Sequence, residues 1–416
     1  MSSEITLDPY RSRYARRTLG MTASEIRALF AVASRPEVVF LAGGMPYTAA
    51  LDFDAVAEVT ERVVRDHGPD ALQYGGGLGL PGLRERLTEV MAAERIPAHA
   101  DDLVVTTGGQ QALDLIAKLF IDPGDVILAE GPSYVGALGA FSAYQAEVVH
   151  VPMDAEGLIP AALTERLDAL RAAGQRPQFL YTVPNHQNPA GVSLAAGRRE
   201  EIVAIAERHD LLIVEDNPYG LLDFKGELHT SLRALAPERV VYVGTLSKIF
   251  APGIRVGWVA APAPIRDKLT LLKEAADLCQ SNLTQHVAQG WLATQPWRRQ
   301  VEVLTEIYRE RCDTLLAELD ANLPPGCAWS APGGGFFVWL SVPNQIDTRD
   351  LLPKAIRGRV AYVPGSAFYA DGSGTSELRL SFGFASSVQI REGIRRLAEV
   401  LHVELELVEA FARERA

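Results

Sequence analysis

The sequence predicts an α/β fold with two domains: a large one built on a mostly parallel sheet flanked by helices, and a smaller α+β one. Three observations support this class. Short β-branched runs alternate with helical patterns from about residue 100 to 262, as in repeated βαβ units. Several of these runs are almost entirely apolar, as strands buried on both faces are. A chain of 416 residues also exceeds what one continuous core normally holds.

The expected strands of the large domain are short, rich in Val, Ile and Leu, and separated by turn-forming residues. They are residues 103–107, 125–129, 147–151, 179–183, 211–215, 240–244 and 256–260. Between them, residues 110–120 and 198–208 have the apolar spacing of amphipathic helices. Such helices would cover both faces of the sheet.

The smaller domain follows a long, charge-rich helical pattern at residues 298–319. Pro324 and Pro325 end this pattern, and strand-like segments then appear, such as 336–340 and 378–382. We expect residues 1–45 to pack beside this domain and the active site, because they precede the first βαβ unit and contain one convincing helix, near 23–33. The predicted organisation is therefore an N-terminal segment (1–45), a large domain (46–295) built on the parallel sheet and a small C-terminal domain (296–416).

The net charge of −12, from 40 Lys and Arg against 52 Asp and Glu, argues against nucleic acid or an anionic membrane as principal partner. The three cysteines are odd in number and far apart, which favours neither disulfides nor zinc. The eight histidines show no metal-ligand spacing, so we expect no metal. Because no apolar run reaches the length of a spanning helix, a cytoplasmic protein is expected.

Three polar stretches lie at the ends of predicted strands. They are residues 184–191, 215–220 and 245–248, the last followed by 253–257. Open α/β sheets bind ligands at the carboxyl ends of their parallel strands. One pocket could therefore collect all three stretches.

The residue types in these stretches suit one kind of chemistry. Lys248, with its pKa lowered, can form an imine with an aldehyde and later shuttle a proton. Asp216, on a neighbouring strand, can keep a pyridine nitrogen protonated and so make the ring an electron sink. Asn188 and Tyr219 can hydrogen-bond a ring oxygen and tune the imine.

A phosphate group would need an anion site in the same pocket. Gly108, Gly109 and Gln110 lie between a strand and a helix, where backbone N–H groups and the helix dipole favour an anion. The hydroxyls of Thr245 and Ser247 and the guanidinium of Arg255 could complete this site. Tyr134, at another strand-to-helix junction, could stack on a pyridine face.

Taken together, these stretches resemble the fold-type-I enzymes that use pyridoxal 5′-phosphate (PLP), specifically the class I and II aminotransferases and their 2-aminoadipate and kynurenine branch. The resemblance covers nearly the whole chain. It includes the Asn-Pro-x-Gly, Asp-x-x-Tyr and Ser-Lys elements and residues 41–44, 74–75, 364–368 and 378–382.

The resemblance implies a role for individual residues. Lys248 would hold PLP as a Schiff base, Asp216 would partner the pyridine nitrogen, and Asn188 and Tyr219 would contact the ring oxygen. Lys248, Asp216 and Tyr219 are then the catalytic set. Arg379 would bind the substrate α-carboxylate.

Other implied contacts involve the substrate and a second subunit. Asn185, Gly44 and Arg27 would lie on the substrate side, the last on a mobile N-terminal helix. Tyr74 would reach the phosphate of a neighbouring subunit, so a homodimer with shared active sites is implied. Two positions depart from the pattern: Gly109 stands where family loops carry a serine, and His186 stands where an aromatic residue is common.

The leading hypothesis is ping-pong transamination between an L-amino acid and a 2-oxo acid. One alternative keeps PLP but ends in elimination, decarboxylation or oxidation, which pocket residues decide. Another is a ligand-sensing domain of a transcription regulator. Dicarboxylic, aromatic and branched amino acids all remain open as substrates. Each site residue also has a structural reading, such as a solvated lysine or a helix-capping aspartate, and only their joint order favours catalysis.

Overall fold

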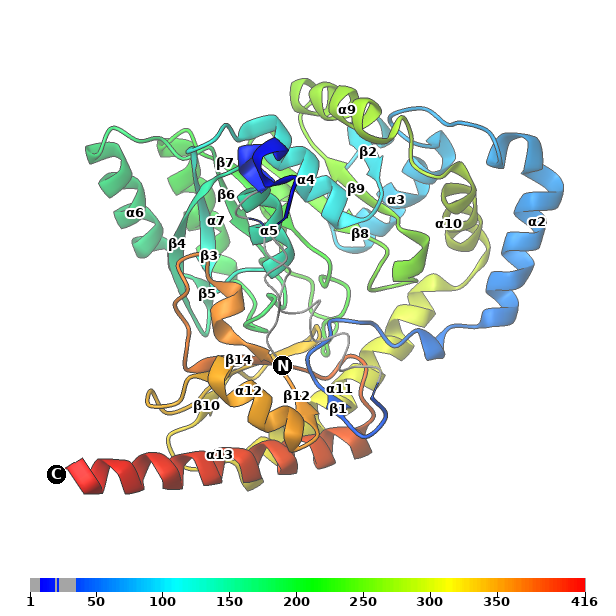
Figure 1. The fold of residues 1–416 in the computed structure, drawn as a ribbon. Coiled ribbons are helices and arrows are strands. Elements are labelled where there is room, and N and C mark those ends of the chain that lie inside the picture. Colours follow the sequence, from blue (N-terminus) through cyan, green and yellow to red (C-terminus); the bar gives the residue numbers. More distant parts are fainter. Residues whose placement is uncertain (1–7, 19–20, 22–34, 416) are drawn as a thin grey trace.

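The structure is a computed structural model that describes residues 8–18, 21 and 35–415. Its two lobes are visible in Figure 1, with a large sheet and its helices in one and the C-terminal elements in the other. The long helix α13 (Ser387–Arg415) runs along the outer side of the second lobe. The predicted α/β class is confirmed.

The large sheet has the strand order β2-β9-β8-β7-β6-β3-β4-β5. All seven predicted strands are present, with ends shifted by only a few residues. The bounds are β2 (Leu103–Thr106), β3 (Val126–Gly131), β4 (Glu147–Asp154), β5 (Gly157–Leu158), β6 (Phe179–Thr182), β7 (Leu212–Asp216), β8 (Val240–Thr245) and β9 (Gly257–Ala260). Strands β4, β3, β6, β7 and β8 pair in parallel, so their carboxyl ends share one edge.

Strand β9 runs antiparallel to both of its neighbours, β8 and β2. The link from β8 holds only the short 3-10 helix η5 (Pro252–Ile254). A parallel crossover needs a dozen or more residues, usually including a helix, so this link can only return the chain antiparallel. As a result β9 starts at the edge where β8 ends, which brings Arg255 to that edge.

Helices cover both faces of the sheet, as expected. One face packs against α4 (Gly109–Phe120), α5 (Val135–Ala143) and α9 (Ala263–Asp277). The other packs against α6 (Pro160–Ala172), α7 (Ala196–Arg208) and the short α8 (Leu232–Leu235). Burial of apolar side chains on both faces accounts for the almost unbroken apolar runs of the central strands.

The second lobe contains an antiparallel sheet of order β10-β11-β14-β13. Its strands are β10 (Ala328–Trp329), β11 (Phe337–Ser341), β14 (Glu377–Ser381) and β13 (Val363–Pro364). Helices α11 (Trp297–Asn322), α12 (Thr348–Arg357) and α13 pack around it. Strand β1 (Val39–Phe40) pairs in parallel with β12 (Val360–Ala361), which ties the segment around residue 40 to this lobe.

Two further helices, α2 (Phe53–Ala71) and α3 (Pro81–Ala93), pack against α10 (Asn282–Thr294) at the far side of the large lobe. The remaining short 3-10 helices are η1 (Arg11–Arg13), η2 (Arg16–Thr18), η3 (Thr48–Ala50), η4 (Ala100–Asp102) and η6 (Gly365–Phe368).

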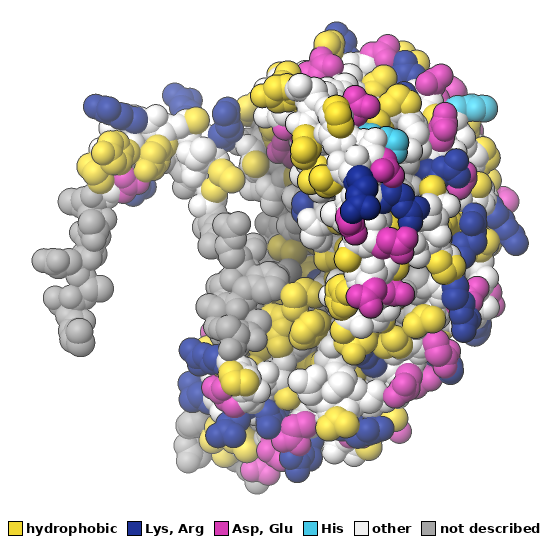
Figure 2. All heavy atoms as spheres, turned by 90° about the vertical axis from the view of Figure 1, so that its right-hand side faces the viewer, with side chains coloured by type: hydrophobic (Ala, Val, Ile, Leu, Met, Phe, Trp, Pro, Cys, Tyr) yellow, Lys and Arg dark blue, Asp and Glu magenta, His cyan; other side chains and the backbone are white. Residues whose placement is uncertain are grey.

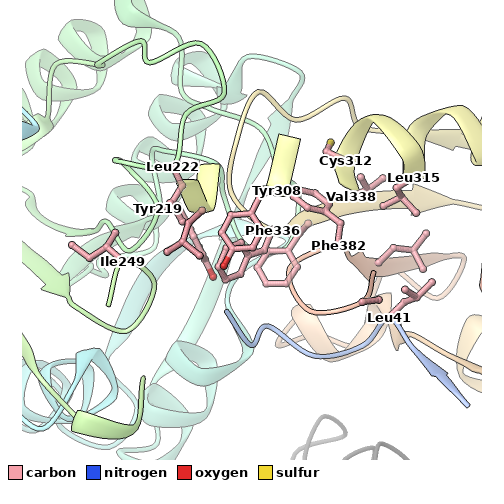
Figure 3. Close-up of a cluster of buried hydrophobic side chains, with 14 of the residues drawn as sticks. Leu41, Tyr219, Leu222, Ile249, Tyr308, Cys312, Leu315, Phe336, Val338 and Phe382 are labelled. Carbon is pink, nitrogen blue, oxygen red and sulfur yellow. The ribbon is translucent and has the colours of Figure 1, made fainter. Parts of the chain in front are cut away.

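One apolar core continues across the junction between the lobes (Figure 3). Phe336, directly before β11 of the second lobe, has its ring centroid 5.3 Å from Tyr219 and 4.7 Å from Tyr308 of α11. All three rings are buried. Because buried aromatic rings pack closely, this contact holds the two lobes against each other beside the pocket described below.

Figure 2 shows Lys and Arg side chains interspersed with Asp and Glu over the face turned toward the viewer. Within the described part of the chain, no helix combines the length and hydropathy needed to cross a membrane. Nor do the described His, Cys, Asp and Glu residues form a cluster of three or more able to hold a metal ion.

Candidate active site

A cavity of about 370 Å³ lies at the carboxyl edge of the large sheet, between the two lobes. Most of the residues that the sequence placed in one pocket line it. They are Lys248, Asp216, Tyr219, Asn188, Tyr134, Arg255, Arg379, Thr245, Ser247, Gly109, Gln110 and Gly44.

Lys248 lies in a turn after the end of β8, and hydrogen bonds between Thr245 and Ser247 stabilise this turn. The Thr245 hydroxyl accepts from the backbone N–H of Ser247 at 3.1 Å, and the two hydroxyls lie 2.9 Å apart. The lysine ammonium donates to the carbonyl oxygen of Gly44 at 2.9 Å. Burial, reinforced by the guanidinium groups of Arg379 and Arg255, lowers the pKa of Lys248 to about 8. A lysine of this kind is far more often neutral, and therefore nucleophilic, than a solvated one.

Asp216 is the last residue of β7, the strand beside β8. It is buried, and burial raises its pKa to about 6, although Tyr181 and the charge of Lys248 oppose the rise. Glu215 before it points to the opposite face of the sheet, where it accepts hydrogen bonds from Ser231 and the start of α8. Strand alternation therefore separates an aspartate in the cavity from a glutamate that caps a helix.

Asn188, Tyr219 and Arg379 form a connected group on the cavity wall. Arg379 Nη1 donates to Asn188 Oδ1 at 2.7 Å, and Asn188 hydrogen-bonds the Tyr219 phenol. The guanidinium also lies 4.2 Å from the ring centroid of Phe337. Burial lowers the pKa of Arg379 to about 10, which leaves it charged at neutral pH. Its Nε is buried without a hydrogen-bond partner among the described residues, so this guanidinium retains a free donor.

The phosphate site expected from the sequence has its parts at one end of the cavity. Helix α4 begins at Gly109, directly after Gly108 with its positive φ of 77°. A Cβ on Gly108 would lie 2.4 Å from Arg255 Nη2, so the close approach of this guanidinium requires glycine. Arg255 is held by the carbonyl oxygens of Thr107 and Pro252 at 3.0 and 3.2 Å. The helix N-terminus, the guanidinium and nearby hydroxyls are groups that could bind an anion together.

The opposite wall comes from parts of the chain far from the strand ends. Gly44, Met45 and Pro46, after β1, line the cavity together with Phe337 of β11. The side chains are apolar and belong to the N-terminal segment and the second lobe. Ala42 in the same segment accepts from Arg379 Nη2 at 2.6 Å.

Three predicted site residues are not on the cavity wall. Asn185 is buried, and its amide donates to Asn217 and accepts from Arg199 at 2.9 and 2.6 Å. Tyr74 is 76% exposed and lies in a separate surface hollow with Cys279 and Asn282. Gly108 lies beneath the wall against Arg255. Arg27, and the helix expected near it, lie outside the described residues.

His186, one of the two positions that depart from the family resemblance, packs against the loop between β10 and β11 of the second lobe. It has a positive φ of 47°, its Nδ1 lies 3.2 Å from the Ser193 hydroxyl, and its Nε2 lies 3.5 Å from Asp223. A Cβ on Gly334 or Gly335 would strike its side chain. Burial lowers its pKa to about 4, so it is neutral at physiological pH. The two glycines thus make room for the imidazole.

Sequence reasoning missed two polar groups behind the wall. Tyr181 donates from its hydroxyl to Asp216 Oδ2 at 2.8 Å. Glu94, at the end of α3, accepts from Asn217 Nδ2 at 2.6 Å. The signal for Tyr181 is the alternation of β6, which becomes usable only once the register of β6 and β7 is known. The position of Glu94 carries no such signal because it lies outside the βαβ region.

A half-buried lysine just after a strand end, near a carboxylate of the adjacent strand and accompanied by two guanidinium groups, is the arrangement of fold-type-I PLP enzymes. The family model for class I and II aminotransferases matches residues 36–397, and the chain belongs to this family. It is a PLP-dependent aminotransferase, as the sequence predicted.

Several known proteins are similar over nearly their whole length. Aromatic-amino-acid aminotransferase 1 of Thermococcus litoralis is 41% identical over 96% of both chains. The structure of Pyrococcus horikoshii kynurenine aminotransferase in complex with PMP matches with a TM-score of 0.91 and 36% identity, over 95% of this chain and 98% of that one. The Thermus thermophilus α-aminoadipate aminotransferase, complexed with N-(5′-phosphopyridoxyl)-L-leucine, matches with a TM-score of 0.89 and 33% identity, over 96% and 99%.

Proposed function

We propose that this aminotransferase holds PLP on Lys248 and transfers the amino group of an L-amino acid to a 2-oxo acid in two half-reactions that share the site. One observation carries the proposal: the cavity combines an amine of lowered pKa, a buried carboxylate at the adjacent strand end and two guanidinium groups. These are the groups needed to bind an aldehyde, a pyridine ring, a phosphate and a carboxylate.

The residues present fit this cofactor on two observations. At one end, the lack of a Cβ at Gly108 leaves the space that Arg255 occupies beside the start of α4, which suits a phosphate. At the other end, Arg379 is buried with an unpartnered Nε, which suits a substrate carboxylate. Lys248 is the one amine among the described residues that line the cavity, so it is the group that would hold the aldehyde.

When bound, PLP supplies a protonated heteroaromatic ring that accepts the electron pair released at the amino-acid Cα. The protein's own groups do the rest. Lys248 Nζ takes the proton from Cα, which its lowered pKa allows near neutral pH. Asp216 keeps a proton on the ring nitrogen, and Asn188 and Tyr219 hydrogen-bond the ring oxygen. Arg379 fixes the carboxylate and therefore the direction of the Cα–H bond.

We infer that the preferred amino donor has a large apolar side chain. Met45, Pro46 and Phe337 line the cavity and offer apolar contact, and the Phe337 ring lies against the Arg379 guanidinium. The described cations that line the cavity are Lys248, Arg255 and Arg379, and each already has a role in this scheme. The name of the Thermococcus litoralis relative, an aromatic-amino-acid aminotransferase, supports the same direction.

We also propose a homodimer in which Tyr74 serves the partner's site. Tyr74 is exposed, and the side chains of Leu72 and Leu278 near the same hollow are 68% and 56% exposed. Contiguous exposed apolar side chains favour a subunit interface. Sedimentation gives the oligomeric state. Co-expressing Lys248→Ala chains with Tyr74→Ala chains should restore part of the activity that either variant lacks, and the idea fails if the protein is monomeric.

The test of the function is transfer of a label. An amino acid carrying ¹⁵N is supplied with a 2-oxo acid, and the label should appear in the newly formed amino acid. Release of labelled ammonia, or of hydrogen peroxide, in place of that product would favour elimination or oxidation. Single-turnover bleaching of the cofactor's visible band then ranks donors. L-Phenylalanine should react faster than L-2-aminoadipate, and the reverse order would overturn the proposed preference.

A further inference from the structure

Tyr181 and Asp216 lie diagonally across two neighbouring strands, on the same face of the sheet. In the parallel register of β6 and β7, Tyr181 stands opposite Val214, two residues before Asp216. Because side chains alternate along a strand, Val214 and Asp216 share a face, and Tyr181 shares it with them. The strand geometry alone thus brings the phenol toward the carboxylate.

The contact between them is a short, fully buried hydrogen bond. The Tyr181 hydroxyl donates to Asp216 Oδ2 at 2.8 Å. Tyr181 is 0% exposed, and its ring is held edge-to-face against Phe141 of α5 at a centroid distance of 5.4 Å. Burial raises the pKa of the Tyr181 phenol well above its ordinary value, so it remains a donor at every working pH.

Several charged or titratable groups act on Asp216 from the elements around it. Lys248 favours the carboxylate, whereas Glu130 disfavours it. The phenols of Tyr134, Tyr219 and Tyr242 are also near enough to feel its charge. Against the desolvation that raises the pKa of Asp216, the Tyr181 hydroxyl is the strongest opposing interaction.

We propose that Tyr181 is a positioning residue for the reaction. By occupying one oxygen of Asp216, it fixes the carboxylate rotamer and keeps the group ionised, so that the other oxygen is directed to the cofactor's ring nitrogen. This inference rests on the role proposed above for Asp216. Tyr181 itself does not line the cavity and contacts neither substrate nor cofactor in this scheme.

The test compares Tyr181→Phe with the parent by two measurements. In the cofactor-free protein, the ionisation midpoint of Asp216 is followed by its infrared carboxylate band, identified by difference from Asp216→Asn. Loss of the hydroxyl should raise this midpoint by about one pH unit. In the second measurement, the dissociation constant for PLP should rise about tenfold, since a hydrogen bond to a charged group is lost.

A double-mutant cycle separates positioning from general damage. If Tyr181 acts through Asp216, Tyr181→Phe should leave the PLP dissociation constant unchanged when introduced into Asp216→Asn. Tyr362→Phe is the matched control, because this buried phenol donates to Thr348 O at 2.7 Å within the second lobe. It should change neither measurement.

Two results would overturn the inference: an unchanged Asp216 midpoint in Tyr181→Phe, or an equal loss of PLP affinity in the Asp216→Asn background. Failure of the parent protein to bind PLP or transfer ¹⁵N would instead refute the proposed function. The infrared titration needs no cofactor, so it tests the contact between Tyr181 and Asp216 in either case.

Discussion

Lys248 Nζ donates to the carbonyl oxygen of Gly44 across the junction of the two lobes, at 2.9 Å. Two residues earlier, the carbonyl oxygen of Ala42 accepts from Arg379 at 2.6 Å. Backbone carbonyl oxygens after β1 therefore accept hydrogen bonds from both Lys248, proposed to hold the cofactor, and Arg379, proposed to bind the substrate. Both groups line the same cavity, so one short backbone segment holds them there.

The close approach of Arg255 to Gly108 at the proposed phosphate site gives a prediction, for which the neighbouring Gly109 supplies a control. Gly108→Ala places a Cβ 2.4 Å from Arg255 Nη2 at a φ of 77°, so the guanidinium must move. Gly109→Ala adds a Cβ whose nearest neighbour is Val243 Cγ1 at 3.8 Å, an ordinary contact. We expect PLP to bind at least about tenfold more weakly to Gly108→Ala. Equilibrium dialysis should show Gly109→Ala near the parent, and equal affinities for all three proteins would refute the phosphate assignment.

Arg379→Lys should lower kcat/KM for substrates that carry an α-carboxylate and should leave kcat/KM for amines without one nearly unchanged. Lysine cannot reproduce a two-pronged guanidinium contact, nor the bond to Asn188 together with the bond to Ala42. We expect kcat/KM for L-phenylalanine to fall about a hundredfold, roughly 2.7 kcal/mol. The matched amine without a carboxylate, 2-phenylethylamine, should be affected little. An equal fall in kcat/KM for the two compounds would contradict the proposal that Arg379 binds the substrate carboxylate.

The pH dependence of cofactor capture follows from Lys248. Burial and two guanidinium groups lower its pKa to about 8, so the neutral, reactive amine accumulates as pH rises toward 8 and little further gain follows above it. The capture rate of pyridoxal, which lacks a titrating phosphate, should show this midpoint in stopped-flow measurements. Arg379→Gln removes a positive charge and should move the midpoint upward. Arg391→Gln, a change at an exposed side chain, should not.

The raised pKa of buried Glu94 predicts that the folded protein becomes less stable as pH rises. Burial raises its pKa to about 8 from 4.5, so between these values the folded protein binds a proton that the unfolded chain has released. Its stabilising contribution is therefore complete below pH 4.5 and is lost as pH rises toward 8, by at most about 1.4 kcal/mol per pH unit. Urea unfolding of the cofactor-free protein at pH 5 to 8 should show a flatter profile for Glu94→Gln. The exposed change Glu207→Gln should follow the parent; parallel profiles for all three would contradict the prediction.

The order of elements and most of the cavity could be predicted because parallel strands end at a common edge. Asp216 and Lys248 are recognisable there in the short polar stretches that close apolar runs. Arg255 was predicted for the same site, although the reversal of β9 that brings it there depends on the shortness of its link to β8 and was not anticipated. The Gly108 turn was visible because a glycine pair precedes an amphipathic pattern.

Other features depend on contacts between distant parts of the chain, which local patterns do not encode. The bond from Lys248 to Gly44 uses a backbone carbonyl, which any residue offers. Asn185 looked like a pocket residue, but its amide is taken up by Asn217 and Arg199 behind the wall. Tyr181 resembles any core aromatic residue in an apolar run until the register of β6 and β7 is known.

The central claim is that Lys248 carries the cofactor, and reductive trapping tests it most directly. The protein is saturated with PLP, treated with borohydride to fix the aldehyde carbon to its amine, digested and analysed by mass spectrometry. The account predicts a pyridoxyl group on the peptide containing Lys248, and no labelled peptide from Lys248→Ala, while the exposed-site variant Lys268→Ala labels like the parent. Stoichiometric labelling of another lysine, with Lys248 unmodified, would contradict it.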